Sequence, residues 1–490
     1  MKTLYLAISV VALTRAAAGQ DVPLFTTDFP PEEFAARRTA VYDAIGSGAV
    51  AVVQGAPSPV GYVRFRQSNE FYYLCGVETP HAYLVLDGTR RRASLYLPHQ
   101  NEGRERSEGK VLSAEDAELV KKLAGVDDVY GPELLAEHLA RLARSSGGRT
   151  LYTPFSPAEG YGTSRDLAIR AVADLAADPW DGRPSREGHF VGLLRMRFPQ
   201  LEIRDLSPTL DRMRLIKSER ELTLIRKATR LSGLAIMEGI RSTVPGQYER
   251  ELDGLAKFIF YRDGAQAEAY YSLIGSGPNA WFPHYHEGKR KMRDGELVLM
   301  DVGPDVGYYS TDVTRQWPVN GKFNEWQREL YGFYLAYYEA ILKAIRPGPV
   351  RDVKKRAGEQ MEAILARATF SKPAYERAAR AFVSSFRATE DEGGSLGHWV
   401  GMAVHDVGPI DGMLRPGMVF TIEPQFRVPE EKIYIRLEDM ILITKDGAEI
   451  LSDFVPRDMD GVERLYREEG LLQRYPGLAP PTEPTAERGK

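Results

Sequence analysis

Hydrophobic and polar residues follow two different patterns along the chain, which predicts two kinds of domain. Across residues 25–207, short β-rich apolar runs alternate with helical periodicities, for example a strand-like run at 49–53 and a helix-like run at 132–143. Such alternation is typical of an α/β domain. The segments 101–110 and 178–188 are charged or contain Gly and Pro, and we expect them to be surface loops.

The second pattern begins at Ser218 and consists of amphipathic helices followed by paired strands. Ser218 and Glu221 have the spacing of a capping box, and apolar residues then recur every three or four positions, which predicts a helix. Two helices followed by a strand pair occur twice along this part of the chain. The other predicted helices lie at 247–263, 324–346 and 350–366, and the predicted strands lie at 297–302, 308–314, 419–426 and 434–444.

The two halves of this region also share spacings, which favours an internal duplication. A turn sequence begins eight residues before Asp301, and a similar turn begins eight residues before Glu423. His284 lies 17 residues before Asp301, and His405 lies 18 residues before Glu423. A second acid follows in each half. We therefore expect two related halves that face each other and surround one cleft with acids and histidines.

Four acids and one histidine carry the strongest chemical signal. They are Asp301, Asp312, His398, Glu423 and Glu438. The acids lie among apolar residues, where a buried carboxylate is costly unless it is paired or binds a cation. Each acid alone would more often be a strand-edge charge or half of a salt bridge, but together they outnumber the nearby cations. A pair of divalent ions explains the whole set, and its oxygen donors favour Mn²⁺ over a thiolate-type zinc site.

The segment 397–406 holds two of the eight histidines, His398 and His405, beside glycines. The glycines predict a close approach of two backbones, so we expect a loop-like entry into a strand. Two histidines in one short segment indicate function rather than core packing. Ser395 lies in a G-x-S-x-G pattern, but no acid lies between it and either histidine. The serine-hydrolase interpretation therefore fails.

Composition excludes several other classes of protein. The chain has 490 residues, 43% of them hydrophobic and 27% charged, as expected for a soluble globular protein with two or three domains. The net charge of −4 provides no basic excess, so we expect no nucleic-acid partner. Cys75 is the one cysteine, which excludes disulfides within the chain and cysteine-rich zinc sites.

Residues 1–19 have the three parts of a secretory signal. Lys2 precedes an apolar run at 4–13, and small residues follow at 16–19. The run is shorter than the roughly 20 residues that a membrane-spanning helix needs. A short buried strand is the alternative interpretation. We expect an exported protein, in the bacterial periplasm or outside the cell, with no membrane span.

These patterns divide the chain into four parts. A signal peptide at 1–19 precedes an accessory α/β domain at 20–208. The catalytic domain follows at 209–465, and we expect a disordered tail at 466–490 because that segment is rich in proline and charge.

Several motifs resemble the pita-bread metallopeptidases, in particular their Xaa-Pro aminopeptidase and prolidase branch. The matching motifs include MDVG at 300–303, TDVTR at 311–315, VHDVG at 404–408, TIEP at 421–424 and IRLED at 435–439. Segment 65–74 resembles the domain that precedes the catalytic one in this family. The resemblance implies an α/β (α+β) fold, in which a creatinase/prolidase-like domain precedes a pita-bread domain with a pseudo-two-fold repeat. It also implies a homodimer formed partly through the N-terminal domain.

By this resemblance, the five residues of the acid and histidine set would hold two divalent metal ions. Mn²⁺ is the expected metal, with Zn²⁺ or Co²⁺ as alternatives. Asp312 and Glu438 would bridge the two ions. Glu423 would be both a ligand and the general base for the bridging water.

The resemblance also assigns residues to the substrate. His284 and His405 would contact the scissile carbonyl and stabilise the oxyanion, which requires donors aimed at the developing charge. Arg436 would orient the substrate or the metal ligands. Gly394, Gln425 and Arg427 stand where the family usually has histidine, glycine and tyrosine, and all three bear on the proline pocket. Arg427 would be able to bind a substrate carboxylate, which favours dipeptides or a carboxypeptidase-like mode.

The sequence therefore predicts a secreted dinuclear metallopeptidase that hydrolyses the peptide bond before proline, in the manner of an Xaa-Pro aminopeptidase. Its substrates would be peptides with proline at the second position. The alternatives are an Xaa-Pro dipeptidase (prolidase) and a proline-specific carboxypeptidase-like activity. A metal-free creatinase-like hydrolase and a non-enzymatic binding module are disfavoured, because the ligand set is complete.

Overall fold

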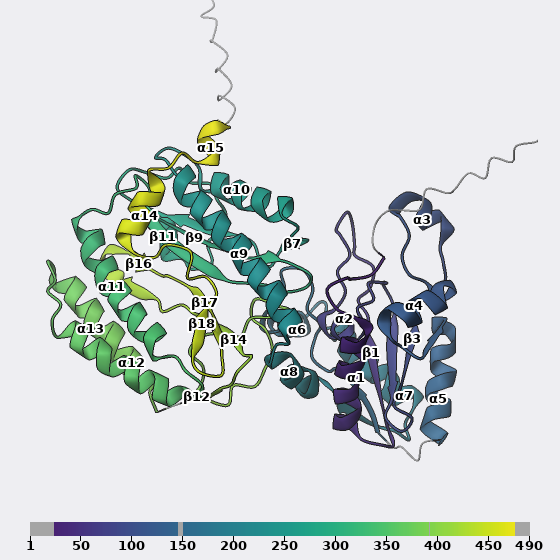
Figure 1. Cartoon of the computed structure of the whole chain (residues 1–490). Coiled ribbons are helices and arrows are strands. Elements are labelled where there is room, and N and C mark those ends of the chain that lie inside the picture. The colour runs from purple at the N-terminus through teal and green to yellow at the C-terminus, as the bar shows by residue number, and fades with distance from the viewer. Residues whose placement is uncertain (1–23, 146–149, 392, 476–490) are drawn as a thin grey trace, which may run out of the picture.

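The computed structural model describes residues 24–145, 150–391 and 393–475, which form two lobes (Figure 1). The N-terminal lobe contains one large sheet, and the C-terminal lobe contains smaller sheets between long helices. This arrangement agrees with the predicted α/β domain followed by a second, mixed domain. The predicted signal at 1–19 lies outside the described residues, as does the 476–490 part of the predicted tail.

The N-terminal lobe is built on a six-stranded mixed sheet with the order β4-β3-β2-β1-β5-β6. Its strands are β1 Ala49–Gln54, β2 Tyr83–Asp87, β3 Arg92–Tyr96, β4 Asp128–Tyr130, β5 Thr150–Thr153 and β6 Glu202–Asp205. β2 is antiparallel to both of its neighbours, while β4, β5 and β6 join by parallel pairing. The alternation of strand-like and helix-like runs in the sequence thus corresponds to a sheet with helices packed against it, and the side chains of its central strands are largely buried.

Seven α-helices accompany this sheet within the described residues. They are α1 Pro31–Ile45, α2 Asn69–Cys75, α3 Glu102–Glu108, α4 Ala117–Ala124, α5 Leu135–Ser145, α6 Arg165–Ala177 and α7 Arg186–Arg197. The prediction of a loop at 101–110 is wrong, because α3 forms there. Asn101 caps this helix by accepting from the Arg104 N–H at 3.0 Å, and Arg104 pairs with Glu108 one turn later.

The helices of the C-terminal lobe lie on both sides of its strands, with α9 and α10 opposite α11–α13 (Figure 1). They are α8 Ser207–Leu215, α9 Glu219–Ser242, α10 Glu249–Arg262, α11 Glu325–Ala344, α12 Val350–Leu365, α13 Pro373–Ala388, α14 Met459–Tyr466 and α15 Leu471–Arg474. The capping box at the start of α9 is confirmed, since the Ser218 N–H donates to Glu221 Oε2 at 2.8 Å and the Ser218 hydroxyl accepts from the Glu221 N–H.

Two three-stranded antiparallel sheets form the centre of this lobe, with the orders β11-β9-β8 and β14-β17-β18. Their strands are β8 Leu273–Ser276, β9 Leu297–Val302, β11 Val313–Pro318, β14 Val419–Ile422, β17 Asp439–Ile443 and β18 Ala448–Ile450. The smaller pairs are β7 Ala267–Glu268 with β10 Pro304–Asp305, β12 Gly348–Pro349 with β13 Met413–Leu414, and β15 Phe426–Val428 with β16 Ile433–Ile435. One sheet follows α9 and α10 as the sequence predicts, whereas the other follows three helices, because α13 forms in addition to the predicted pair.

Three predicted strands are interrupted in the structure. The strand expected at 308–314 begins only at Val313, because the chain turns at Tyr308, whose φ is +74°. The strand expected at 419–426 stops at Ile422, before Pro424, which has no N–H to donate to a ladder. The strand expected at 434–444 is divided into β16 and β17. These breaks matter because three of the candidate metal ligands lie beside them.

The start of the predicted disordered tail is ordered. Helix α15 packs near α9, where Gln473 Nε2 donates to the Ser242 carbonyl at 2.9 Å and Leu472 packs against the core. Among the described helices, none combines the length and the apolar character that a membrane crossing requires.

Candidate metal centre

The first half of the catalytic lobe contributes two acids, Asp301 within β9 and Asp312 immediately before β11. Asp301 lies opposite Thr314 in the β9–β11 pairing. Because side chains alternate between the two faces of a strand, residues 312 and 314 share a face. Both acids therefore lie on the same side of this sheet.

The second half contributes Glu423, directly after β14, and Glu438, directly before β17. Ile422 pairs with Asp439, so extending that register by one residue places Glu423 opposite Glu438. An isolated β-bridge joins Thr314 to Glu438, and Thr314 Oγ1 donates to Glu438 Oε2 at 2.8 Å. This bridge brings the acids of the two halves together.

His398 enters from the loop before β14, as predicted. Its carbonyl accepts from the Thr421 N–H at 3.1 Å, and the next residue, Trp399, forms a bridge with Phe420. A Cβ on Gly397 would collide with the Thr421 carbonyl. The predicted close backbone approach is thus confirmed, because only glycine fits between these two segments.

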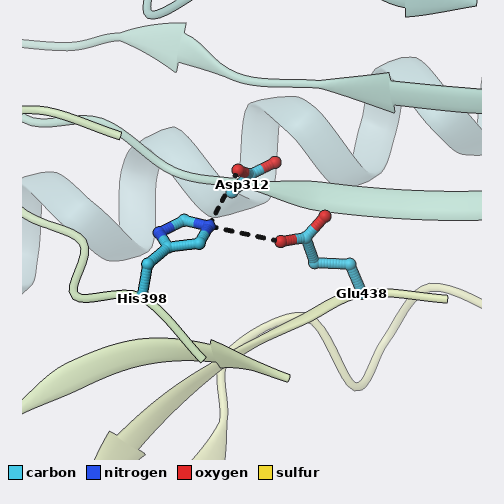
Figure 2. A group of neighbouring side chains, drawn as sticks. All are labelled: Asp312, His398 and Glu438. Atoms are coloured by element: carbon cyan, nitrogen blue, oxygen red, sulfur yellow. Dashed lines mark ion pairs between the residues drawn. The ribbon is translucent and has the colours of Figure 1, made fainter. Parts of the chain in front are cut away.

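The His398 imidazole points between carboxylates of both halves (Figure 2). Its Nε2 lies 3.5 Å from Asp312 Oδ2, 3.4 Å from Glu423 Oε1 and 3.7 Å from Glu438 Oε1. Asp312, His398 and Glu438 each offer one ligand atom, and these atoms lie within 4.8 Å of one another. Three ligand atoms at this separation are able to share one metal ion.

Burial and mutual repulsion disfavour the charged forms of these acids. Burial, together with the neighbouring Glu438 and Asp301, raises the pKa of Asp312 well above its usual value. Burial and Glu438 raise the pKa of Glu423 to about 7. Burial lowers the pKa of His398, but the neighbouring carboxylates of Asp312 and Glu438 outweigh this effect and raise it. Ionisation of all these acids would thus place excess negative charge in a largely buried site, and a divalent cation would neutralise that charge.

One buried carboxylate oxygen of the cluster accepts no hydrogen bond. Arg436 is buried and contacts Asp301, and its Nη1 lies 3.3 Å from Glu423 Oε2. Glu438 Oε1 is buried and has no hydrogen-bond partner. Such an orphaned oxygen is costly unless a cation binds it. A donor set of carboxylate oxygens with one imidazole nitrogen therefore fits a divalent metal ion.

Tyr270 belongs to the site, although sequence reasoning missed it. Its hydroxyl lies 2.6 Å from Asp301 Oδ1 and 2.5 Å from Asp312 Oδ1. A phenol has one proton to donate, so it cannot satisfy both carboxylates at once. Tyr270 lies in the loop between β7 and β8, where no periodicity or motif of the sequence analysis pointed to it.

His405 joins the site, as predicted. Its ring centroid lies 4.2 Å from that of His398, and its Nδ1 lies 3.1 Å from Asp166 Oδ2. Burial and the neighbouring His398 lower the pKa of His405. Asp166 comes from α6 in the N-terminal lobe, which the sequence assigned to an accessory role.

The other predicted substrate residues lie apart from these contacts. His284 is exposed in the loop that follows the 3₁₀ turn Gly277–Trp281, where it lines a surface pocket with Gln425. Arg427 donates to the Trp281 carbonyl at 3.3 Å and to Gln425 Oε1 at 3.2 Å, and it packs over the Tyr434 ring. Neither residue has a described contact with the five candidate ligands. Their assignment to the substrate stays a prediction.

Gly394 differs from the expected family pattern in its backbone as well as its side chain. Its φ is +74° and that of Gly393 is +67°. A histidine, which the family usually has at this position, would be strained in this left-handed conformation. The backbone just before His398 therefore favours glycine over histidine at position 394.

Known proteins resemble this chain along nearly all of its length. Residues 223–445 match the model of metallopeptidase family M24, and residues 34–152 match that of the aminopeptidase P N-terminal domain. The Xaa-Pro aminopeptidase of Escherichia coli K12 is 30% identical over 461 residues, covering 89% of this chain and 97% of that protein. An Xaa-Pro dipeptidase of Pyrococcus horikoshii is 30% identical over 268 residues, which cover 54% of this chain and 70% of that protein.

Solved structures give the same result. A glutamate-to-alanine variant of Escherichia coli aminopeptidase P in complex with substrate matches with a TM-score of 0.71 and 27% identity, covering 89% of this chain and 98% of that one. The predicted pita-bread fold and family resemblance are thus confirmed. The chain belongs to metallopeptidase family M24: it is a hydrolase, and it has the fold of aminopeptidase P.

Proposed function

We propose that this protein is an Xaa-Pro aminopeptidase that uses two divalent metal ions to hydrolyse the peptide bond before proline. The observation that carries the proposal is the convergence of Asp312, His398 and Glu438 at the junction of the two catalytic halves, where a buried Glu438 oxygen accepts no hydrogen bond. The similarity to the Xaa-Pro aminopeptidase of Escherichia coli supports the substrate class.

The five predicted ligands would hold the metal ions. Asp312 and Glu438 come from different halves and both face His398, which supports their role as the shared ligands. When bound, the metal ions supply Lewis-acid activation of water near neutral pH. Mn²⁺ is the proposed metal because the ligands are mostly carboxylates.

Glu423 is the proposed general base. Its side chain is 23% exposed, whereas those of Asp312, Asp301 and Glu438 are 9%, 3% and 1% exposed. It is therefore the acid of the set that incoming water reaches most easily. Arg436 forms ion pairs with both Glu423 and Asp301 and would orient their carboxylates.

His405 is the proposed partner of the scissile carbonyl. Its side chain is 37% exposed and lies beside His398, so a peptide reaching the cluster would meet it. A donor placed there would stabilise the negative charge that develops on the carbonyl oxygen. His284, on the exposed loop near Gln425, would contact the same substrate.

The test is a hydrolysis panel on the metal-stripped full chain, with and without added Mn²⁺. We expect Mn²⁺-dependent release of the N-terminal residue from Xaa-Pro-Yaa tripeptides and no cleavage of proline-free controls. Activity that does not depend on metal, or the absence of cleavage of every Xaa-Pro peptide, would contradict the proposal.

An Xaa-Pro dipeptidase is the second candidate, and Arg427 is the observation that favours it. Its guanidinium lies beside Gln425, which lines the pocket that also contains His284. A cation there would bind the free carboxylate of a dipeptide. Dipeptidase activity would appear in the same panel as cleavage of Xaa-Pro dipeptides with tripeptides left intact, and Arg427→Met would then raise KM for the dipeptides.

We also propose that the chain is exported after removal of residues 1–19. The charged, apolar and small-residue segments of this stretch support that proposal. The mass of the protein recovered from a bacterial host would test it. A mature chain that begins near Gln20 is expected, and a chain that retains Met1–Gly19 in an export-competent host would contradict it.

A further inference from the structure

The N-terminal lobe reaches into the candidate active site through the start of α6. This helix lies at the junction between the two lobes (Figure 1). Asp166 Oδ2 lies 3.1 Å from His405 Nδ1, and the Ser164 hydroxyl accepts from the His405 N–H at 3.4 Å. Two residues of one lobe thus hold both the ring and the backbone of a histidine that belongs to the other.

Buried ion pairs fix the residues on both sides of this contact. Arg165, next to Asp166, contacts Glu70 and lies 3.3 Å from Glu159 through its Nε. Arg214 Nη1 lies 2.9 Å from Glu159 Oε2, and its Nη2 lies 2.5 Å from an oxygen of Asp406, the residue after His405. A chain of charges therefore connects the start of α6 with the His405 segment.

This network is costly unless every member is paired. The side chains of Glu159, Arg214 and Asp406 are 0%, 1% and 1% exposed. Separation of these buried charges from their partners would leave them uncompensated and is therefore strongly unfavourable. These ion pairs link Arg165, next to Asp166, with Asp406, next to His405, and so hold Asp166 at a defined position relative to His405.

We propose that Asp166 is a positioning residue for His405, supplied by the N-terminal lobe. Its carboxylate accepts the Nδ1–H of the imidazole, which fixes the ring plane and the tautomer and leaves Nε2 as the nitrogen presented to the substrate. This inference rests on the proposed function, because it assigns His405 to the substrate. The N-terminal lobe is then a working part of the active site.

A stabilising surface ion pair is the competing explanation of the contact. Asp166 is 45% exposed, and exposed pairs contribute little to folding stability. The two explanations differ in what the loss of the carboxylate would change. A surface pair affects only the melting temperature, whereas a positioning residue affects turnover through His405.

The test is a double-mutant cycle on the full-length, metal-loaded protein with Xaa-Pro-Yaa peptides. Asp166→Ala is expected to lower kcat by roughly 10–100-fold with a smaller change in KM, as is typical of groups that orient an active-site histidine. In a His405→Ala background, the same substitution should change kcat less than about twofold, because the residue it positions is already absent. Asp166→Glu, which restores the acceptor, should recover part of kcat.

Asp174→Ala is the matched control, since Asp174 is an exposed acid on the same helix. Its kcat and KM should equal those of the unmodified protein. An equal loss from Asp166→Ala in both His405 backgrounds would overturn the proposal, because a positioning role requires the two effects to be non-additive. An unchanged kcat for Asp166→Ala would overturn it as well.

A second measurement does not depend on activity. Protein labelled with ¹⁵N-histidine and loaded with diamagnetic Zn²⁺ should show ring nitrogens of the Nδ1–H tautomer for His405, identified by their loss in His405→Ala. Asp166→Ala should shift this signal, whereas Asp174→Ala should not. If the protein cleaves no Xaa-Pro peptide, the proposed function fails, and the histidine spectrum still decides whether Asp166 holds His405. A spectrum unchanged by Asp166→Ala would overturn the inference alone.

Discussion

Arg315 and Asp439 form a fully buried ion pair behind the candidate metal centre, with Arg315 Nη2 2.6 Å from Asp439 Oδ1. Arg315 Nη1 also donates to the carbonyl of Glu438 at 2.8 Å, and Glu438 immediately precedes Asp439. Burial raises the pKa of Asp439, but Arg315 and Arg457, together with a hydrogen bond from the Ser452 hydroxyl, outweigh burial and keep this pKa below its usual value. The pair therefore anchors the backbone that presents Glu438.

Replacement of Arg315 should destabilise the fold strongly. Arg315→Met leaves Asp439 buried without its main partner, which is expected to cost about 3–5 kcal/mol of unfolding free energy. Chemical denaturation of the metal-free protein measures this cost. Arg380→Met is the control, because Arg380 pairs with Glu376 on the exposed surface of α13 and should cost less than about 1 kcal/mol. Equal effects of the two substitutions would contradict the anchoring role.

Removal of the Tyr270 hydroxyl should weaken metal binding. Tyr270→Phe deletes the group that touches both Asp301 and Asp312, and loss of such a supporting contact typically lowers metal affinity by about 10–100-fold. Calorimetric titration of the metal-stripped protein with Mn²⁺ measures the change. Tyr271→Phe, at an exposed neighbouring position, should bind Mn²⁺ like the unmodified protein. If both variants bind equally well, Tyr270 does not support the ligands.

Substitution of Glu423 should abolish most turnover while the fold persists. Glu423→Gln keeps the shape of the side chain but removes its basicity, so kcat should fall by roughly 10²–10⁴-fold. Steady-state assays with an Xaa-Pro-Yaa peptide measure the loss, and thermal melting shows whether the fold remains. Glu430→Gln, on the exposed turn after β15, should keep full activity. A loss of less than tenfold for Glu423→Gln would remove it as the general base.

Asp406 should make folding stability depend on pH in the acid range. Burial raises its pKa, but Arg214 and Lys217 outweigh burial and hold the pKa below the usual value. Its stabilising contribution is therefore present above the ordinary aspartate pKa of about 3.9 and is lost as the pH falls through the lower pKa of the folded state.

Comparison of Asp406→Asn with the unmodified protein tests this dependence. The difference in unfolding free energy should be largest near neutral pH and should shrink as the pH falls below about 4. Urea denaturation at a series of pH values measures it. Asp174→Asn should show no difference across the same range. A difference in unfolding free energy between Asp406→Asn and the unmodified protein that is the same at every pH would contradict the role assigned to the Asp406 charge.

Local pattern was enough to predict much of the fold. The capping box at Ser218, the helical periodicities of the catalytic lobe and the apolar strand β9 depend on residues that are neighbours in sequence. The predictions failed where the backbone turns for reasons that no periodicity expresses. The positive φ of Tyr308 delays β11, and Pro424 ends β14 beside Glu423. At 101–110, local capping and charge pairing formed a helix where charge alone suggested a loop.

The sequence by itself determined the family and the five candidate ligands, because each acid lies in a short motif within an apolar run. Only the tertiary structure decided which groups support them. Asp166 and His405 are 239 positions apart in the sequence, and Tyr270, whose hydroxyl contacts Asp312, is 42 positions from it. Contacts between such distant residues depend on how the lobes and sheets pack. A single exposed aspartate or a tyrosine in a loop has no local pattern that reveals what it will touch.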